Sequence, residues 1–156
     1  MLRKATVTDI PKIEDMARAS YGQLLAADYP ARTITAALPV MARVTPDFIA
    51  QARYMVWDVD GQIVGGAGWS LCDGGADVRK VAVHPDHLRM GVGRALMAAI
   101  EADARSEGQH GAMRCASSLS AVRFYEACGF VRVGVDQIET PLDGVVFDIV
   151  LLRKTL

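Results

Sequence analysis

The chain has 156 residues, of which 51% are hydrophobic, and a formal net charge of −1. A chain of this size and apolar content can bury one core without disulfides or metals, so residues 1–156 are expected to form a single domain. The near balance of charge argues against nucleic acid or an anionic membrane as a partner. No run reaches the ~20 apolar residues of a membrane span, and the opening MLRKATVTDI lacks a signal-peptide core, so a cytoplasmic protein is expected.

The three cysteines, Cys72, Cys115 and Cys128, are far apart and form no CxxC pair. Disulfides and a thiolate zinc site are therefore not expected, and the cysteines are interpreted as small buried hydrophobes. His84 and His87 have an HxxH spacing without a third ligand, so no bound metal is expected either.

The first third of the chain predicts a short strand at residues 2–6, followed by a helix that Thr8 or Asp9 would cap. Residues 21–44 contain two prolines and short apolar patches, which predict one broken helix with loops. Thr45 then precedes proline in TPDFIAQAR, a pattern typical of a helix start.

A hairpin is expected over residues 54–72, because two β-rich runs flank the turn dipeptide Asp60-Gly61. Its second strand contains three glycines, which weaken strand pairing. They suggest bulges, or places where another group comes close to the backbone. These glycines are Gly65, Gly66 and Gly68.

The remaining chain alternates strands and helices. Strands are expected at residues 77–84, 110–116, 130–140 and 145–154, with helices at 92–108 and 117–130. The passage from Asp77 to Cys115 predicts a right-handed parallel crossover. The whole order predicts an α/β or mixed α+β fold, in which a mixed, mostly antiparallel sheet of about seven strands is flanked by about four helices.

The stretch HPDHLRMGVGRALM places Gly91 and Gly93 at a helix start, where glycine is otherwise unfavourable. Unpaired N–H groups and the helix dipole make such a start an anion site, and glycine lets the anion approach the backbone. Arg89 and Arg94 would add positive charge. The alternative is that the glycines only fit a tight turn. The spacing matches neither a P-loop nor a dinucleotide fingerprint.

Two motifs together resemble a known family. VAVHPDHLRMGVGRALM resembles the acyl-CoA-binding signature of the GNAT superfamily of N-acetyltransferases, and SLSAVRFYEACGF resembles the second signature of that family. Leu88 replaces the usual Gln or Arg of the first motif. Ser118 replaces the usual Asn of the second, and could still cap the helix that follows.

The resemblance implies acetyl-CoA as co-substrate and no metal. Its diphosphate would lie on the N–H groups of Arg89, Met90, Gly91, Val92, Gly93 and Arg94. Its pantetheine would lie beside Val81, Ala82 and Val83, in a strand that commonly has a bulge whose N–H polarises the thioester. Further contacts to the cofactor are expected from Ser118, Ala121 and Tyr125.

Direct attack of an amine on the thioester needs a base for the ammonium and an acid for the departing thiolate. The resemblance assigns the acid to Tyr125, whose alternative is an ordinary core aromatic. Asp77 is the candidate base, although it could equally end a turn, and Asp73 is a poorer candidate.

The acceptor is expected to be the primary amine of a small molecule, with a peptide amine as second choice. The alternative function is a non-catalytic acyl-CoA-binding or sensing domain. Tyr21, Tyr29 and Arg32 are candidates for acceptor recognition, while Trp57 and Trp69 are expected in the core or at the acceptor cleft. The resemblance also leaves a homodimer open, since members of the family often form dimers.

Overall fold

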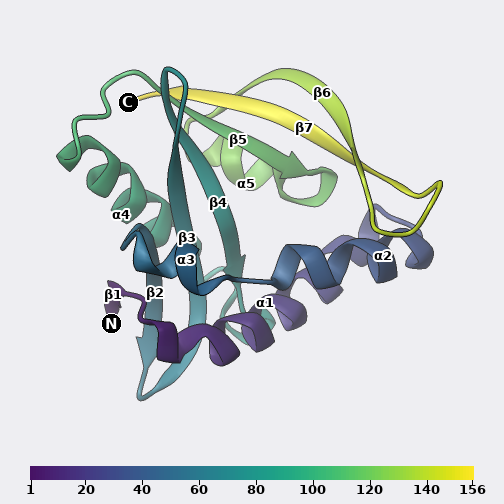
Figure 1. The fold of residues 1–156 in the computed structure, drawn as a ribbon, viewed down its shortest axis with the longest axis horizontal. Coiled ribbons are helices and arrows are strands. Elements are labelled where there is room, and N and C mark those ends of the chain that lie inside the picture. Colours follow the sequence, from purple (N-terminus) through teal and green to yellow (C-terminus); the bar gives the residue numbers. More distant parts are fainter.

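The computed structural model describes residues 1–156 and contains one seven-stranded sheet with helices on both faces (Figure 1). Its order is β1-β2-β3-β4-β5-β7-β6. The strands are β1 (Leu2–Lys4), β2 (Tyr54–Val59), β3 (Gln62–Cys72), β4 (Gly75–Val83), β5 (Ala112–Ser118), β6 (Val131–Glu139) and β7 (Val146–Thr155). Only β4 and β5 pair in parallel, so the predicted mixed, mostly antiparallel sheet and the parallel crossover are confirmed.

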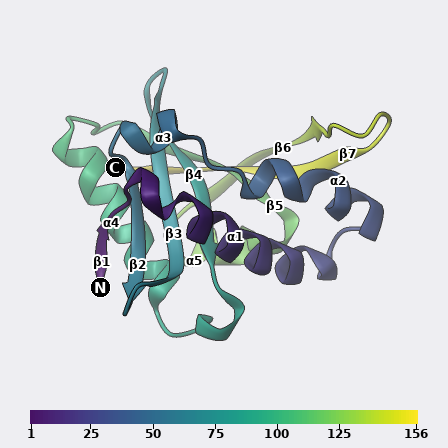
Figure 2. The same ribbon diagram turned by 60° about the horizontal axis from the view of Figure 1, so that its bottom comes forward.

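Five α-helices cover the sheet in two layers, with α1 to α3 on one face and α4 and α5 on the other (Figure 2). They are α1 (Ile10–Leu24), α2 (Ala31–Ala42), α3 (Pro46–Ala50), α4 (Val92–Ser106) and α5 (Val122–Ala127). Short 3-10 turns are η1 (Val7–Asp9), η2 (Leu25–Ala27), η3 (Pro85–His87) and η4 (Leu119–Ala121). None of these helices combines the length and the apolar character that a bilayer crossing requires.

The region from residue 21 to residue 44 differs from its prediction. Instead of one broken helix, α1 continues to Leu24 and a separate helix, α2, follows with Pro39 inside it. The buried Leu25 and Tyr29 hold the connection between the two helices in the core. Tertiary packing therefore extends both helices beyond what their local sequence favours.

Helix termini largely follow the expected chemistry. The Thr45 hydroxyl accepts a bond from the Phe48 N–H and caps α3 as predicted. Gly129 ends α5 in the left-handed conformation, and the buried Phe130 donates its N–H to the Tyr125 carbonyl. Asp9 precedes α1, but its carboxylate binds Arg3 and Thr6 instead of capping that helix.

β4 and β5 separate shortly after they meet. Their parallel pairing covers only Gly75–Asp77 against Ala112–Arg114. Beyond this point β4 continues along β3, while β5 continues along β7. In Figure 1 the two strands diverge from their common end, so the sheet opens into a V.

A β-bulge bends β4 inside this opening. Gly66 pairs with Ala82 and Gly68 pairs with Arg79, so Lys80 and Val81 lie opposite the single residue Ala67. Lys80 has a φ of 52°, in the left-handed region that non-glycine residues rarely adopt. A bulge adds one residue to a strand and sharpens its bend, so it directs the end of β4 away from β5.

Two buried tyrosines hold the bulge. The Tyr54 hydroxyl donates to the Lys80 carbonyl at 2.9 Å, and the Tyr21 hydroxyl donates to the Val81 carbonyl at 2.8 Å. Tyr54 comes from β2 and Tyr21 from α1, so two distant parts of the chain hold the bulge from the same side of the sheet. Burial raises the pKa of both phenols, which therefore remain hydrogen-bond donors.

The glycines of β3 make room for Tyr54. A Cβ on Gly66 would collide with the Tyr54 hydroxyl and ring, and one on Gly68 would lie 2.6 Å from the Tyr54 ring. The close approach predicted for this strand is therefore confirmed. The register shift in this part of β3 confirms the predicted bulge as well.

We expect Gly66→Ala to lower the free energy of unfolding by about 1–3 kcal/mol, because the methyl group forces a pinned ring to move. Gly134→Ala is the matched control, since its Cβ would lie at an ordinary 3.7 Å from Leu151. Urea unfolding measures both variants. Equal stability of the two would contradict the role given to Tyr54.

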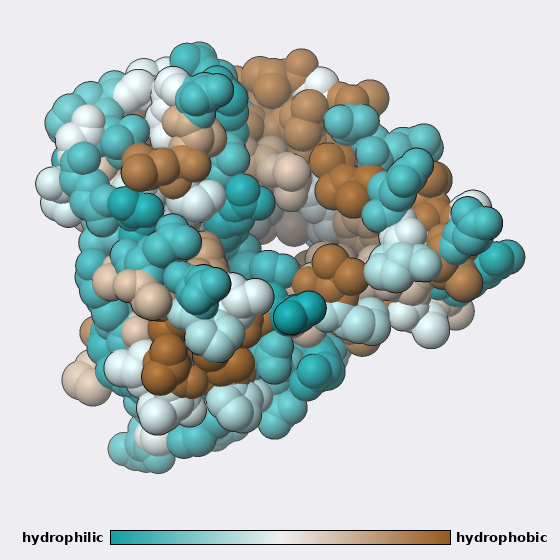
Figure 3. Space-filling model, in the orientation of Figure 1, coloured by the Kyte–Doolittle hydropathy of each residue, from teal (hydrophilic) through white to brown (hydrophobic).

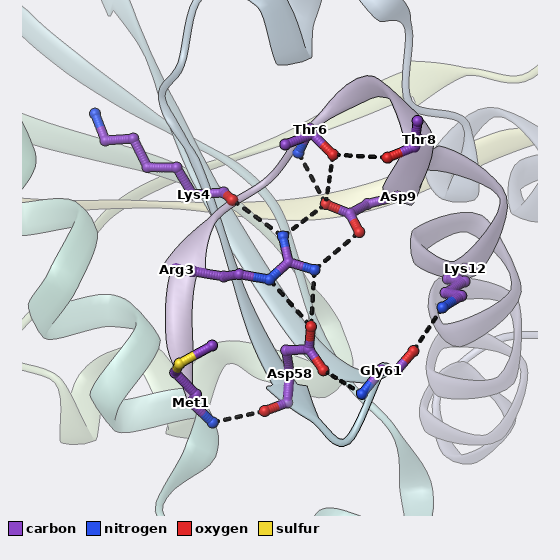
Figure 4. Close-up of polar contacts among 9 residues, drawn as sticks. All are labelled: Met1, Arg3, Lys4, Thr6, Thr8, Asp9, Lys12, Asp58 and Gly61. Atoms are coloured by element: carbon purple, nitrogen blue, oxygen red, sulfur yellow. Dashed lines mark hydrogen bonds and ion pairs between the residues drawn. The ribbon is translucent and has the colours of Figure 1, made fainter.

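An ion-pair cluster fixes β1 against η1 and the β2–β3 turn (Figure 4). The Arg3 guanidinium binds both carboxylate oxygens of Asp9, at 2.8 and 2.9 Å, and lies 2.8 Å from the Asp58 carboxylate. Asp58 also accepts the Gly61 N–H. The hydrogen bonds from Arg3 lower the pKa of Asp9 to about 2 and also lower that of Asp58.

The Asp9 carboxylate thus favours the folded state when it is ionised. Its contribution, about 1–2 kcal/mol, should be complete above the unfolded pKa of about 4 and should be lost as the pH falls toward about 2. Arg3→Gln should lower stability at pH 7 by this amount and flatten the acid-side loss. Arg18→Gln, which breaks only the exposed pair with Asp15, is the control. Urea unfolding at pH values from 7 to 3 measures the free energy of unfolding of each variant. If this free energy falls equally with pH in wild type and Arg3→Gln, the role of the Arg3–Asp9 pair is refuted.

Candidate active site

A hollow of about 380 Å³ lies beside the end of β4, bounded by α1 on one side and α5 on the other. We call it the α1–α5 hollow. The β4 residues Val81, Ala82 and Val83 line it together with Ala121 and Tyr125. The structure therefore brings five of the predicted cofactor-binding residues to one cavity.

Tyr125 lies on α5 and is 7% exposed. Burial raises its pKa well above the ordinary value, and the neighbouring Cys115 thiol raises it further. Burial also raises the pKa of Cys115 to about 12. The phenol therefore keeps its proton near neutral pH and can donate a hydrogen bond to a ligand in the hollow.

Ser120 is a functional candidate that the sequence analysis missed. Its hydroxyl oxygen is buried, lines the α1–α5 hollow and has no hydrogen-bond partner in the protein. A buried hydroxyl without a partner costs free energy, so it marks a place where a ligand can bind. Ser118, which was expected here, does not line the hollow, and its side chain makes no cap bond to the following turn.

The start of α4 presents a run of backbone donors. The N–H groups of Arg89 through Arg94 have no acceptor within the protein. Arg89 and Gly91 both have positive φ, 60° and 83°, which turns the loop sharply into the helix. Free N–H groups in such a turn, together with the helix dipole, form an anion-binding concavity.

Glycine is required at the two positions of this helix start for different structural reasons. Gly91 adopts the left-handed conformation, and a Cβ there would meet nothing within 4 Å. A Cβ on Gly93 would lie 2.9 Å from the Phe124 ring, so Gly93 lets α4 pack closely on α5. The tight-turn alternative thus accounts for Gly91, and helix packing accounts for Gly93.

Asp77 lies in a second hollow, which we call the β5–β7 hollow because it extends from β4 across β5 and β7. It is the third residue of β4, so it does not end a turn. Its carboxylate is 3.6 Å from the Arg79 guanidinium. The structure does not bring Asp77 and Tyr125 into one cavity. Cys115 of β5 borders the second hollow, but its side chain packs on the other face of the sheet, beside Tyr125.

Most other aromatic candidates belong to the core. Tyr21 holds the bulge, and Tyr29 stacks on Phe147 with ring centroids 4.4 Å apart. The Trp69 indole is fully buried and donates to Asp103 at 2.8 Å, and Trp57 packs in the same apolar cluster. Neither tryptophan lines either hollow.

The remaining polar candidates are at the surface or in a turn. Arg32 is exposed on α2. The His84 Nδ1 accepts the Asp86 N–H at 3.2 Å, so one of its ring nitrogens is used within the turn. No group of three or more metal-ligating side chains comes together in the structure.

A family model described as an acetyltransferase (GNAT) domain matches residues 50–132, more than half of the chain. The chain therefore belongs to the GNAT family of acetyltransferases, and the resemblance of its two motifs is confirmed. The matched range contains the β4 bulge, the start of α4 and Tyr125. Acetyl transfer is the activity of this class, while the acceptor depends on the site of each member.

Solved structures share the fold along the whole chain. A GCN5-related N-acetyltransferase from Rhodopseudomonas palustris has a TM-score of 0.83 and 22% identity, over 100% of this chain and 95% of that chain. PaiA N-acetyltransferase from Thermoplasma acidophilum, in complex with coenzyme A, has a TM-score of 0.73 and 14% identity, over 100% and 98%. YncA from Salmonella typhimurium, with acetyl-CoA as its cofactor, has a TM-score of 0.69 and 20% identity, over 100% and 93%.

A second substitution can distinguish the structural roles of Gly91 and Gly93. Gly91→Ala and Gly93→Ala should each lower the free energy of unfolding by about 1–2 kcal/mol, the first through left-handed strain and the second through overpacking. Phe124→Leu removes the atoms that a Cβ on Gly93 would meet, so it should restore part of the loss in Gly93→Ala only. A double-mutant cycle by thermal unfolding measures this coupling. Rescue of Gly91→Ala, or no rescue of Gly93→Ala, would show that the packing explanation is wrong.

Proposed function

We propose that the protein transfers the acetyl group of acetyl-CoA to the primary amine of a small molecule. The amine nitrogen attacks the thioester carbonyl, the N–C bond forms, and the C–S bond breaks to release CoA. The observation that carries this proposal is the opening between β4 and β5, where a bulge held by Tyr54 and Tyr21 lies near the protonated Tyr125.

The diphosphate of CoA would bind the start of α4. The free N–H groups of Arg89 through Arg94 suit an anion, because they are unpaired donors at the N-terminus of α4, where the helix dipole is positive. The exposed Arg89 and Arg94 side chains add charge at the rim. Gly91 supports this role by permitting the turn.

The pantetheine would lie along β4 in the α1–α5 hollow. Beyond Asp77 the edge of β4 that faces β5 has no strand partner, so an extended amide chain can pair with it as another strand would. Ser120 offers the unpartnered hydroxyl of the same cavity. A backbone N–H at the Lys80–Val81 bulge would then polarise the thioester carbonyl.

Proton transfers need one group on each side of the reacting carbon. Tyr125 would donate a hydrogen bond and then its proton to the departing sulfur. Its raised pKa keeps the phenol protonated near pH 7. Asp77 would accept the proton of the incoming ammonium through intervening water, since direct transfer needs hydrogen-bond contact. Its place on β4, three residues before Lys80, puts it about 10 Å along the strand from the bulge.

Tyr125→Phe should lower kcat by roughly 10²-fold, as expected for loss of a general acid, and should leave the affinity for CoA unchanged. A thiol-release assay with acetyl-CoA and a panel of amines gives kcat, and calorimetry gives the CoA affinity. Tyr29→Phe removes another buried hydroxyl, one that donates to the Asp148 carbonyl, and should leave kcat unchanged. Wild-type turnover in Tyr125→Phe would exclude the acid role.

A further inference from the structure

The β5–β7 hollow has a volume of about 260 Å³ and lies on the face of the sheet opposite α4 and α5. Met113 and Cys115 pack in the apolar cluster beneath those helices, so the alternating residues Arg114 and Ala116 point to the other face. Figure 3 shows that face hollowed between the part built on β3 and β4 and the part built on β6 and β7. The hollow begins where β4 and β5 separate.

Positive charge dominates this hollow. Three arginines line it, Arg79, Arg114 and Arg153, against the single carboxylate of Asp77. Arg79 has partners, because it lies 3.6 Å from Asp77 and donates to the Ser70 hydroxyl at 2.9 Å. Arg114 and Arg153 form no ion pair and no side-chain hydrogen bond.

The strand register places these two unpaired arginines together. Arg114 of β5 lies directly opposite Arg153 of β7 in the antiparallel ladder, and Asp77 pairs with Arg114 from β4. Like charges directly opposite each other destabilise a sheet. An anion between the two guanidinium groups would turn this repulsion into attraction, since arginine binds carboxylates through paired N–H donors.

The position of the hollow connects it to the reaction. Asp77 lies in it, and the hollow begins where β4 and β5 separate, while the Cys115 side chain lies beside the Tyr125 hydroxyl on the opposite face of β5. We propose that the β5–β7 hollow binds the acceptor, and that the acceptor is a small amine which also carries a carboxylate, as a free amino acid does. Arg114 and Arg153 hold the carboxylate, and the amine points past Asp77 toward the bulge. This inference rests on the proposed acetyl transfer.

The same charges select against other amines. Three guanidinium groups and one carboxylate repel acceptors that carry several positive charges and no anion, such as polyamines. The unfavourable contact with the wrong amine contributes to specificity as much as the favourable contact with the carboxylate.

The test compares matched acceptors on the whole protein. Free amino acids, their carboxamides and the corresponding decarboxylated amines differ only in the carboxylate, and the thiol-release assay gives kcat/KM for each. We expect the free amino acid to exceed both analogues by at least about 10-fold. Arg114→Gln and Arg153→Gln should each lower its kcat/KM by about 10- to 100-fold through KM, with little change for the carboxamide.

Stability provides a second readout. Because each substitution removes one of two repelling charges, Arg114→Gln and Arg153→Gln should leave Tm unchanged or raise it, so lost activity would not reflect unfolding. Arg132→Gln is the control, since Arg132 pairs with Glu126 of α5 and does not line the hollow. It should retain the full preference for the carboxylate.

The outcomes separate this inference from the proposed function. Acetylation of amines with equal or better kcat/KM for the carboxamides would overturn the carboxylate site and leave acetyl transfer intact. If no amine is acetylated, calorimetry with the same amino acids on CoA-saturated protein still tests whether the carboxylate site binds them. Binding that is lost in Arg114→Gln supports the site, and no binding to the wild type overturns it.

Discussion

The separation of β4 from β5 is the constraint on which the rest of this molecule depends. The strands pair for only three residues on each side, and the bulge at Lys80 then bends β4 away. Hydrogen bonds from Tyr54 and Tyr21 fix the bulge from β2 and from α1. Without them β4 could straighten and pair further with β5, which would close the opening that an extended thioester needs. Gly66 and Gly68 of β3 serve the same end, because they leave room for the Tyr54 ring against β3.

Much of this architecture could be predicted from the sequence. The Asp60-Gly61 turn and the helix start at Thr45 are local signals, and each was confirmed. The separate helix α2 could not be predicted, because its prolines and short apolar patches resemble a loop until the core packs on it. A bulge was suggested by the glycines of β3 and by the resemblance, but the tyrosines that hold it could not be predicted, since the hydrogen bonds join residues 60 and 26 positions apart.

The site shows the same division. Motifs located Tyr125 and the start of α4, because both depend on short runs of sequence. Ser120 was missed, since only the fold buries its hydroxyl against a cavity. The Arg114–Arg153 pair was also invisible, because the two residues are 39 positions apart and meet only through strand register. Asp77 and Tyr125 lie in different cavities, since strand alternation and helix packing place them on different faces of the sheet.

The most direct measurement of the central claim is a crystal structure of the protein with bound CoA. The account predicts that the diphosphate accepts hydrogen bonds from the N–H groups between Arg89 and Arg94. It also predicts that the pantetheine runs along the open edge of Val81–Val83, with the sulfur near the Tyr125 hydroxyl. CoA bound elsewhere on the surface, or a complex in which β4 and β5 pair beyond Asp77 and close the opening, would contradict it.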